Sequence, residues 1–174
     1  MQFTSFHQLS THLVRVSLPA IKVQLGRALT DIGEAIIDEA RAEIGTTTPQ
    51  QAISPYPTWS PLAASTVATK LRRGLGRGGN PESILYATGA FYRDIDKRVN
   101  LHGLSVTVGT NKEYIVYTEL GTSRMPPRPV FGPAALRAVP KRLSVVARFA
   151  ALGIVGIRAV PYPQKGSVQH HNFP

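Results

Sequence analysis

A helical pattern of apolar residues dominates the first quarter of the chain. Between Pro19 and Ile44, apolar side chains recur at spacings of three and four residues, namely Leu25, Leu29, Ile32, Ile36, Ala40 and Ile44. This spacing places them on one face of an α-helix. Pro19 suits the first helical turn, where its missing N–H costs little, and Gly45 is a natural end. The pattern predicts a long amphipathic helix over residues 19–44.

The segment before this helix has a weaker pattern of the same kind. In residues 1–18, Phe3, Phe6, Leu9 and Leu13 follow one another at spacings of three to four. We expect either a short amphipathic helix or an N-terminal arm that orders against a neighbouring molecule.

Prolines and glycines interrupt the pattern after the long helix. Residues 45–60 hold three prolines and predict a loop, which Trp59, the single tryptophan, pins to the core. Ser60 and Pro61 predict the N-cap and first residue of a short helix that ends near Arg73. Residues 74–80 (GLGRGGN) lack the Lys-Ser/Thr and the preceding strand of a phosphate-binding loop. They predict a mobile basic connector.

Alternating apolar and polar residues appear in the middle of the chain. A short turn or helix through Phe91 and Tyr92 is expected to lead into a strand near 95–101. Residues 104–109 (LSVTVG) predict a second strand, and the turn between the two makes an antiparallel hairpin. The run 114–120 fits a third strand or a short helix. Its spacing of three, and Gly121 after it, favour the helix.

The last third of the chain predicts a stiff loop and a helix. Gly121–Pro129 (GTSRMPPRP) contains three prolines and is expected to be extended. A helix opens at Gly132-Pro133 and ends near Leu152, and Pro140 is expected to kink or divide it. Residues 153–174 predict an edge strand with a tail, or an arm that docks on a neighbour.

Together these elements predict an α+β fold. A long N-terminal helix and a C-terminal helix pack on a small antiparallel sheet, with extended loops and terminal arms. The length of 174 residues fits one domain, with an N-terminal arm or short helix at 1–18, a core at 19–152 and a C-terminal extension at 153–174.

The charge distribution is uneven along the chain. The net charge is +10, five of the ten acids lie between residues 31 and 43, and no acid follows Glu119. The split fits a solvated basic surface, a nucleic acid, or an acidic partner surface. In a self-assembling protein, the acidic helix of one copy would meet the basic end of the next.

No catalytic constellation stands out. The chain has no Cys, and its five His residues show no metal-ligand spacing. Asp94 and Asp96 are the nearest carboxylate pair, and on one strand they would merely share a face. We therefore expect no enzyme activity, no cofactor and no metal. No apolar run is long enough to span a membrane, and the N-terminus is not a convincing signal peptide.

Three phrases in a fixed order resemble virion proteins of tailed bacteriophages. Trp59–Leu62 and Ile84–Gly89 resemble the virion morphogenesis proteins of myophage-like systems. Val106–Phe131 resembles the head–tail joining family through Val108-Gly109-Thr110-Asn111, Tyr114, Glu119, Gly121-Thr122 and Pro127-Arg128-Pro129. Here Val130 displaces the aromatic residue of the family phrase by one position. The resemblance covers about residues 20–150.

The resemblance implies a non-enzymatic protein of the neck, tail-completion or tail-terminus type. It implies a homo-oligomeric ring, sixfold or twelvefold, that joins the head connector to the tail around the DNA channel. The expected partners are copies of itself, a head-closure or connector protein, and a tail-tube or tail-terminator protein. Non-specific contact with packaged DNA is also expected. The implied location is the virion, after synthesis in the bacterial cytoplasm. The alternative, from the charge, is a basic nucleic-acid-binding module.

Two sets of residues are candidates for these contacts. The inter-subunit or neck-partner contacts are expected at Arg124, Met125, Pro127, Arg128, Pro129 and Phe131. The contacts with the DNA channel or an acidic partner are expected at Lys70, Arg72, Arg73 and Arg77. Replacing Arg124 and Arg128 together with Glu is expected to impair joining while the monomer stays folded.

Overall fold

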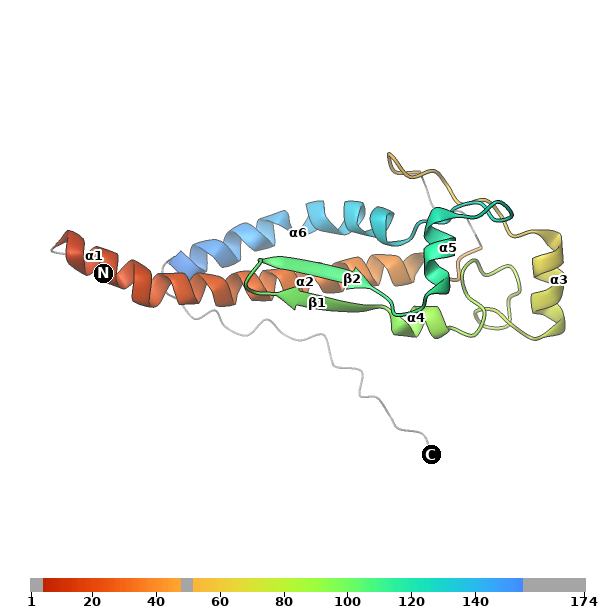
Figure 1. Ribbon diagram of the computed structural model, residues 1–174, viewed down its shortest axis with the longest axis horizontal. Helices are drawn as coiled ribbons and strands as arrows, with labels where there is room; N and C mark the ends of the chain where they lie inside the picture. Colours follow the sequence, from red (N-terminus) through yellow and green to blue (C-terminus); the bar gives the residue numbers. More distant parts are fainter. Residues whose placement is uncertain (1–4, 48–51, 155–174) are drawn as a thin grey trace, which may run out of the picture.

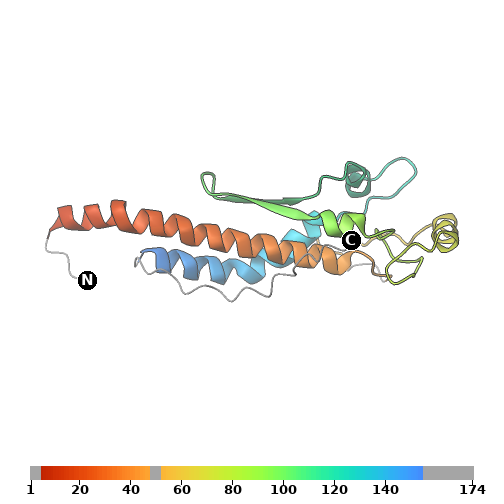
Figure 2. The ribbon, with the colours of Figure 1, turned by 90° about the horizontal axis from the view of Figure 1, so that it is seen from below.

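The long helix α2 (Leu18–Glu43) is the element against which the other main elements pack (Figure 1). The computed structural model describes residues 5–47 and 52–154. In Figure 2, α2 runs between a two-stranded antiparallel sheet and the C-terminal helix α6 (Phe131–Ile154). The predicted α+β class is confirmed, whereas α6, expected to pack on the sheet, packs against α2 on the side opposite to the sheet.

α2 continues a helical run that begins at Phe6. Helix α1 (Phe6–His12) passes through one π-helical turn, η1 (Leu13–Ser17), directly into α2. In this turn the N–H of Leu18 donates to the carbonyl of Leu13, five residues back instead of four. The wider turn stands next to Pro19, whose ring would clash with a carbonyl four residues back in a regular helix.

The helix start predicted at Pro19 is therefore wrong. Of the two alternatives for residues 1–18, the structure has the helix, which forms one rod with α2 (Figure 2). Phe3 lies outside the described residues. The predicted apolar face of α2 is confirmed in its second half, where Ile32, Ile36 and Ala40 are buried and lead to the buried Ile44.

The sheet is the predicted hairpin. Strand β1 (Asp96–Asn100) pairs antiparallel with β2 (Ser105–Gly109). The hairpin packs closely on α2 at Gly33. A Cβ added there would lie 2.9 Å from Val106 Cγ2 and 2.8 Å from Lys97 Cδ. A residue without a side chain at this position therefore lets the hairpin approach the helix.

Helix α6 packs against α2 and runs without a break through Pro140. Of the two alternatives expected for Pro140, a kink or a division of the helix, the division is wrong. Pro140 and Leu136, whose carbonyl loses its N–H partner, are both exposed, so that solvent can take the missing bond. Figure 2 shows the axis of α6 bending along its course. The predicted C-terminal extension lies, from residue 155 onward, outside the described residues.

Three short helices and their loops form one end of the molecule (Figure 1). They are α3 (Ala64–Arg72), α4 (Ala90–Asp94) and α5 (Tyr114–Leu120). The prediction of a helix at 114–120 is confirmed. Gly121 ends it with a φ of 75°, a conformation that favours glycine.

The predicted start of α3 is wrong. Its N-cap is Ala63, and Ser60 and Pro61 precede the helix in an extended segment. Their carbonyl groups accept hydrogen bonds from the Arg128 side chain, 68 and 67 residues away in the sequence. Ser60 and Pro61 therefore contact a distant arginine and do not form the helix start that their local pattern predicts.

Candidate functional site: a docking end built from α3, α5 and the Pro/Arg loop

The three sequence phrases of the resemblance meet at this end of the molecule. Trp59, which is 2% exposed, donates from its indole Nε1 to the carbonyl of Pro129 at 2.9 Å. Arg128 donates from Nε and Nη2 to the carbonyl of Ser60 at 3.2 and 3.1 Å, and from Nη2 to that of Pro61 at 3.0 Å. The phrases at 59–62 and 106–131 are thus joined by one buried and three partly buried hydrogen bonds. The prediction that Trp59 pins its loop to the core is confirmed.

Helix α5 exposes four large, mainly apolar side chains and keeps Thr118 and Glu119 partly buried. Tyr114, Val116, Tyr117 and Leu120 are 49%, 56%, 60% and 77% exposed. Among the large side chains of the helix, Ile115 is the buried one, at 4%. Four large apolar side chains exposed on seven residues form a patch of the kind that marks interaction surfaces. We call these four residues the α5 face.

Thr118 and Glu119 of α5 hold the loop 121–129, here called the Pro/Arg loop, in place. The backbone carbonyl of Thr118 accepts from the N–H of Arg128 at 2.7 Å. The Glu119 carboxylate accepts from the N–H groups of Val130 at 2.8 Å and Phe131 at 3.3 Å. These donors lie at the N-terminus of α6, where backbone N–H groups lack helical partners and favour a negative charge. Burial raises the pKa of Glu119, and the two N–H donors oppose that rise.

We expect replacement of Glu119 with alanine to lower the free energy of unfolding by about 1–2 kcal/mol, because two N–H donors lose their acceptor. Glu119→Gln keeps the acceptor oxygen and should cost less than half as much. Chemical denaturation of the three proteins measures both values. Equal stability of wild type and Glu119→Ala would show that the carboxylate does not cap α6.

A groove of about 300 Å³ lies between α3, the segment 85–91 and α5. Its walls are mostly apolar, with Leu62 and Leu85 beside Phe91, and Ile115 and Met125 contributed by α5 and the loop. Tyr114 belongs both to the groove and to the α5 face, so the two surfaces are continuous. Ligand sites in proteins typically combine such apolar walls with a few polar groups.

Two buried cations line this groove. Lys70 is 8% exposed and donates from Nζ to the carbonyl of Ser83 at 2.5 Å, and Arg128 is 5% exposed. Neither forms an ion pair with another described residue. Burial lowers the pKa of both side chains from their ordinary values. None of the described residues that line the groove is acidic.

The groove brings together members of both predicted contact sets. Lys70 comes from the DNA-channel or acidic-partner set, and Met125 and Arg128 come from the inter-subunit set. No sequence signal pointed to this combination, because α3 and the Pro/Arg loop are about fifty residues apart and contact one another only in the fold. Leu62, Leu85 and Ile115 also line the groove and were not among the predicted contact residues, because their apolar character indicates burial and nothing more specific.

The other predicted contact residues lie in different surroundings. Arg72, Arg73, Arg124 and Pro127 are exposed. Pro129 is buried, and Phe131 packs edge-on against Phe91 with ring centroids 6.1 Å apart, so these two belong to the core and its edge.

The Arg77 side chain is held by contacts with the body of the protein. Its Nη1 donates to the carbonyl of Ile44 at 3.2 Å, and its guanidinium lies 5.6 Å from the ring centroid of Tyr92. The loop 74–80 is held at its middle, where the N–H of Gly76 donates to the carbonyl of Ala87 and Ser83 Oγ accepts from the N–H of Arg77. The expected mobile basic loop is thus tied to the body of the protein, and Arg77 is not a free contact.

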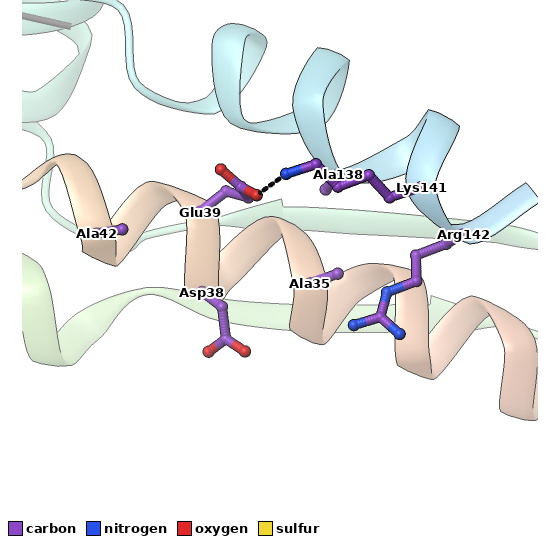
Figure 3. A pocket seen from close by; sticks show the side chains of 7 residues that line it. All are labelled: Ala35, Asp38, Glu39, Ala42, Ala138, Lys141 and Arg142. Carbon is purple, nitrogen blue, oxygen red and sulfur yellow. Dashed lines mark hydrogen bonds and ion pairs between the residues drawn. The ribbon is translucent and has the colours of Figure 1, made fainter.

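The acidic cluster of α2 pairs mainly within the chain. Glu43 pairs with Arg137, Glu39 with Lys141 at 2.6 Å and Asp31 with Arg142 at 3.6 Å, all between α2 and α6. Figure 3 shows Glu39 directed at Lys141, whereas Asp38 points away from α6. Glu34 pairs with Lys97 of β1 at 2.9 Å.

These pairs correct the expectation that the acidic helix of one copy meets the basic end of the next. Most of the acids of α2 and several bases of α6 neutralise one another inside one molecule. The acids of α2 lie opposite the bases of α6 because the two helices run antiparallel. The sequence alone does not show this arrangement. The uneven charge distribution is therefore largely a property of the fold.

The described residues hold no evident reaction centre. Asp94 ends α4 and accepts hydrogen bonds from the Thr110 hydroxyl at 2.6 Å and the Asn111 N–H at 2.9 Å, which lower its pKa. It anchors a turn, and it does not share a strand with Asp96. In the part of the chain that the structure describes, no group of three or more His, Asp or Glu side chains is placed to hold a metal ion. Among the helices described, none is long and apolar enough to cross a membrane.

No protein-family model matches the chain. No curated protein and no solved structure matches it either. Membership of a phage protein family therefore stays a prediction that rests on the three phrases.

Proposed function

We propose that this chain is a structural subunit at the head–tail junction of a tailed bacteriophage, where it joins the head connector to the tail around the DNA channel. The observation that carries the proposal is the α5 face, four large exposed apolar side chains beside a loop that hydrogen bonds hold to the body of the protein. A surface of this kind binds a partner at a low cost of ordering. The three phrases that resemble virion proteins meet next to it.

The elongated shape is compatible with a ring of copies. Helix α1 has no buried residue among its seven positions and projects beyond the body at the end opposite to α5 (Figures 1 and 2). Two different exposed surfaces at opposite ends favour head-to-tail contacts, which close into rings when the rotation between copies allows it. A sixfold or twelvefold ring remains part of the proposal.

The proposal predicts that the chain is a component of finished particles. Mass spectrometry of purified particles should detect it in a small, fixed ratio to the major head protein. Particles that contain head and tail proteins but lack this chain would contradict the proposal. Treatment of intact particles with protease before the measurement is the control for loosely attached material.

The second candidate, a basic nucleic-acid-binding module, is favoured by the exposed Arg72, Arg73 and Arg124. Against it, ion pairs and backbone carbonyls within the chain already engage many of the cations. Binding of isolated protein to duplex DNA that weakens steeply with salt would support this candidate. Absence of binding at low salt would eliminate it.

A further inference from the structure

Two cationic side chains that no described side chain neutralises, Lys70 and Arg128, line the groove. A buried cation loses its hydration, and proteins compensate this loss with an anion or with several hydrogen bonds. Elsewhere in the described residues, Arg137 meets that need through Glu43. Lys70 and Arg128 have backbone carbonyls as their partners instead.

Both cations have N–H donors for which no described residue is the acceptor. The ammonium group of Lys70 has three N–H donors, and one of them is engaged with Ser83. The guanidinium of Arg128 has five, and its Nη1 donates to no described residue. The carbonyl bonds fix the position of the two side chains, which is what a preorganised recognition site requires.

We infer that this groove binds a segment of a partner protein in which a carboxylate side chain stands beside large apolar side chains. The charge complementarity carries the inference, because two positive groups and no acidic one line a space with apolar walls. The carboxylate would accept hydrogen bonds from Lys70 and Arg128, which are charge-assisted and therefore strong. The apolar side chains would contact Leu62, Leu85 and Met125, and the α5 face would extend the contact.

The shape of the site favours a peptide segment over a nucleic acid. The cations are 92–95% buried, as their exposures of 8% and 5% show, and the walls are apolar. Backbone phosphates of duplex DNA are usually met by exposed Lys and Arg side chains on a polar surface. This inference rests on the proposed function, because the partner is taken to be a protein at the head–tail junction. The isolated protein is sufficient to test it.

The test uses two matched tripeptides, acetyl-Phe-Glu-Leu-amide and acetyl-Phe-Gln-Leu-amide. The chain has two methionines, and Met125 lines the groove, so that methyl-labelled methionine gives an NMR signal in the groove that the variant Met125→Leu identifies by its loss. We expect the Glu peptide to shift the Met125 signal with a dissociation constant at least fivefold lower than that of the Gln peptide.

Lys70→Leu should reduce the preference for the Glu peptide at least threefold. Arg72→Leu is the matched control, because Arg72 lies on the same helix, is exposed and does not line the groove. It should keep the preference. If Lys70→Leu does not fold, the comparison of the two peptides on the wild-type protein still decides the question.

Equal affinity for the two peptides, or no shift of Met125 with either, would overturn the inference. A single-stranded oligonucleotide that competes with the Glu peptide at equal concentration would also overturn it, in favour of a phosphate ligand. These results are independent of whether the chain is found in phage particles. The groove inference and the proposed function can therefore fail separately.

Discussion

Replacing Arg128 with glutamate is expected to lower the free energy of unfolding by more than about 3 kcal/mol. Three hydrogen bonds from the guanidinium to the carbonyls of Ser60 and Pro61 would be lost. The new carboxylate would face these same carbonyl oxygens in a buried position. For a domain of this size, the melting temperature should fall by roughly 10 °C, measured by circular dichroism or calorimetry.

Arg124→Glu is the matched control for this prediction. Arg124 lies four residues earlier in the same loop and is exposed, so the substitution should change the stability by no more than about 0.5 kcal/mol. Equal stability of the Arg128→Glu and Arg124→Glu proteins would show that the Arg128 contacts do not hold the loop.

The same contacts correct the expectation that a double Glu variant at 124 and 128 impairs joining while the monomer stays folded. Arg128 is 5% exposed, and the double variant should lose stability. A defect in joining would then report unfolding instead of a lost surface contact. Substitutions on the α5 face, such as Tyr117→Ser with Leu120→Ser, test the docking surface without this complication, because both side chains are exposed.

The second large effect is expected at the Glu43–Arg137 pair between α2 and α6. Glu43 is 7% exposed, and its Oε2 has no hydrogen-bond partner among the described residues. Removal of Arg137 would leave a buried carboxylate without its cation. At pH 8 we expect Arg137→Leu to cost about 3–5 kcal/mol, measured by denaturant unfolding.

Lys141→Met is the control for the Arg137 substitution. Lys141 pairs with Glu39 at 2.6 Å between the same two helices, but its side chain is 64% exposed. Exposed pairs contribute little, so we expect a cost of less than about 1 kcal/mol. Equal costs for the two substitutions would show that burial does not distinguish the pairs.

The buried pair also predicts a dependence of stability on pH. Burial raises the pKa of Glu43 to about 7, from 4.5 in the unfolded chain, and Arg137 opposes that rise without cancelling it. Between these two pH values the folded state binds more protons than the unfolded state. The stability contributed by Glu43 is therefore present at pH 4.5 and is lost as the pH rises through about 7.

In magnitude, unfolding at pH 8 should require about 2 kcal/mol less free energy than at pH 5. Glu43→Gln should remove most of this difference, and the comparison of the two proteins isolates Glu43 from other titrating groups. The cost of Arg137→Leu should be smaller at pH 5 than at pH 8, because the carboxyl group is then protonated. An equal change in the free energy of unfolding between pH 5 and pH 8 in the wild-type and Glu43→Gln proteins would contradict this assignment.

Local patterns predicted those parts of the fold that depend on neighbouring residues. The hairpin followed from alternation and turn residues, and α5 followed from its spacing and Gly121. The start of the long helix was wrong because Pro19 was interpreted by its local preference. A single π turn before it allows the helix to continue.

The candidate site could be predicted only in part, because it depends on contacts between distant residues. Arg128 in a Pro-rich loop has the pattern of an exposed contact residue, and nothing nearby in the sequence shows that it reaches Ser60. Lys70 likewise follows an ordinary helical pattern, and its burial comes from the segment around Ser83. The pairing of the acids of α2 with the bases of α6 required the antiparallel arrangement of two helices about a hundred residues apart.

Electron microscopy of particles made without this chain tests the central claim most directly. We expect DNA-filled heads and separate tails, and a return to joined particles when the wild-type chain is supplied from a plasmid. A chain with Tyr117→Ser and Leu120→Ser, folded but altered on the α5 face, should restore joining poorly. Normal numbers of joined particles in the absence of the chain would contradict its role at the head–tail junction.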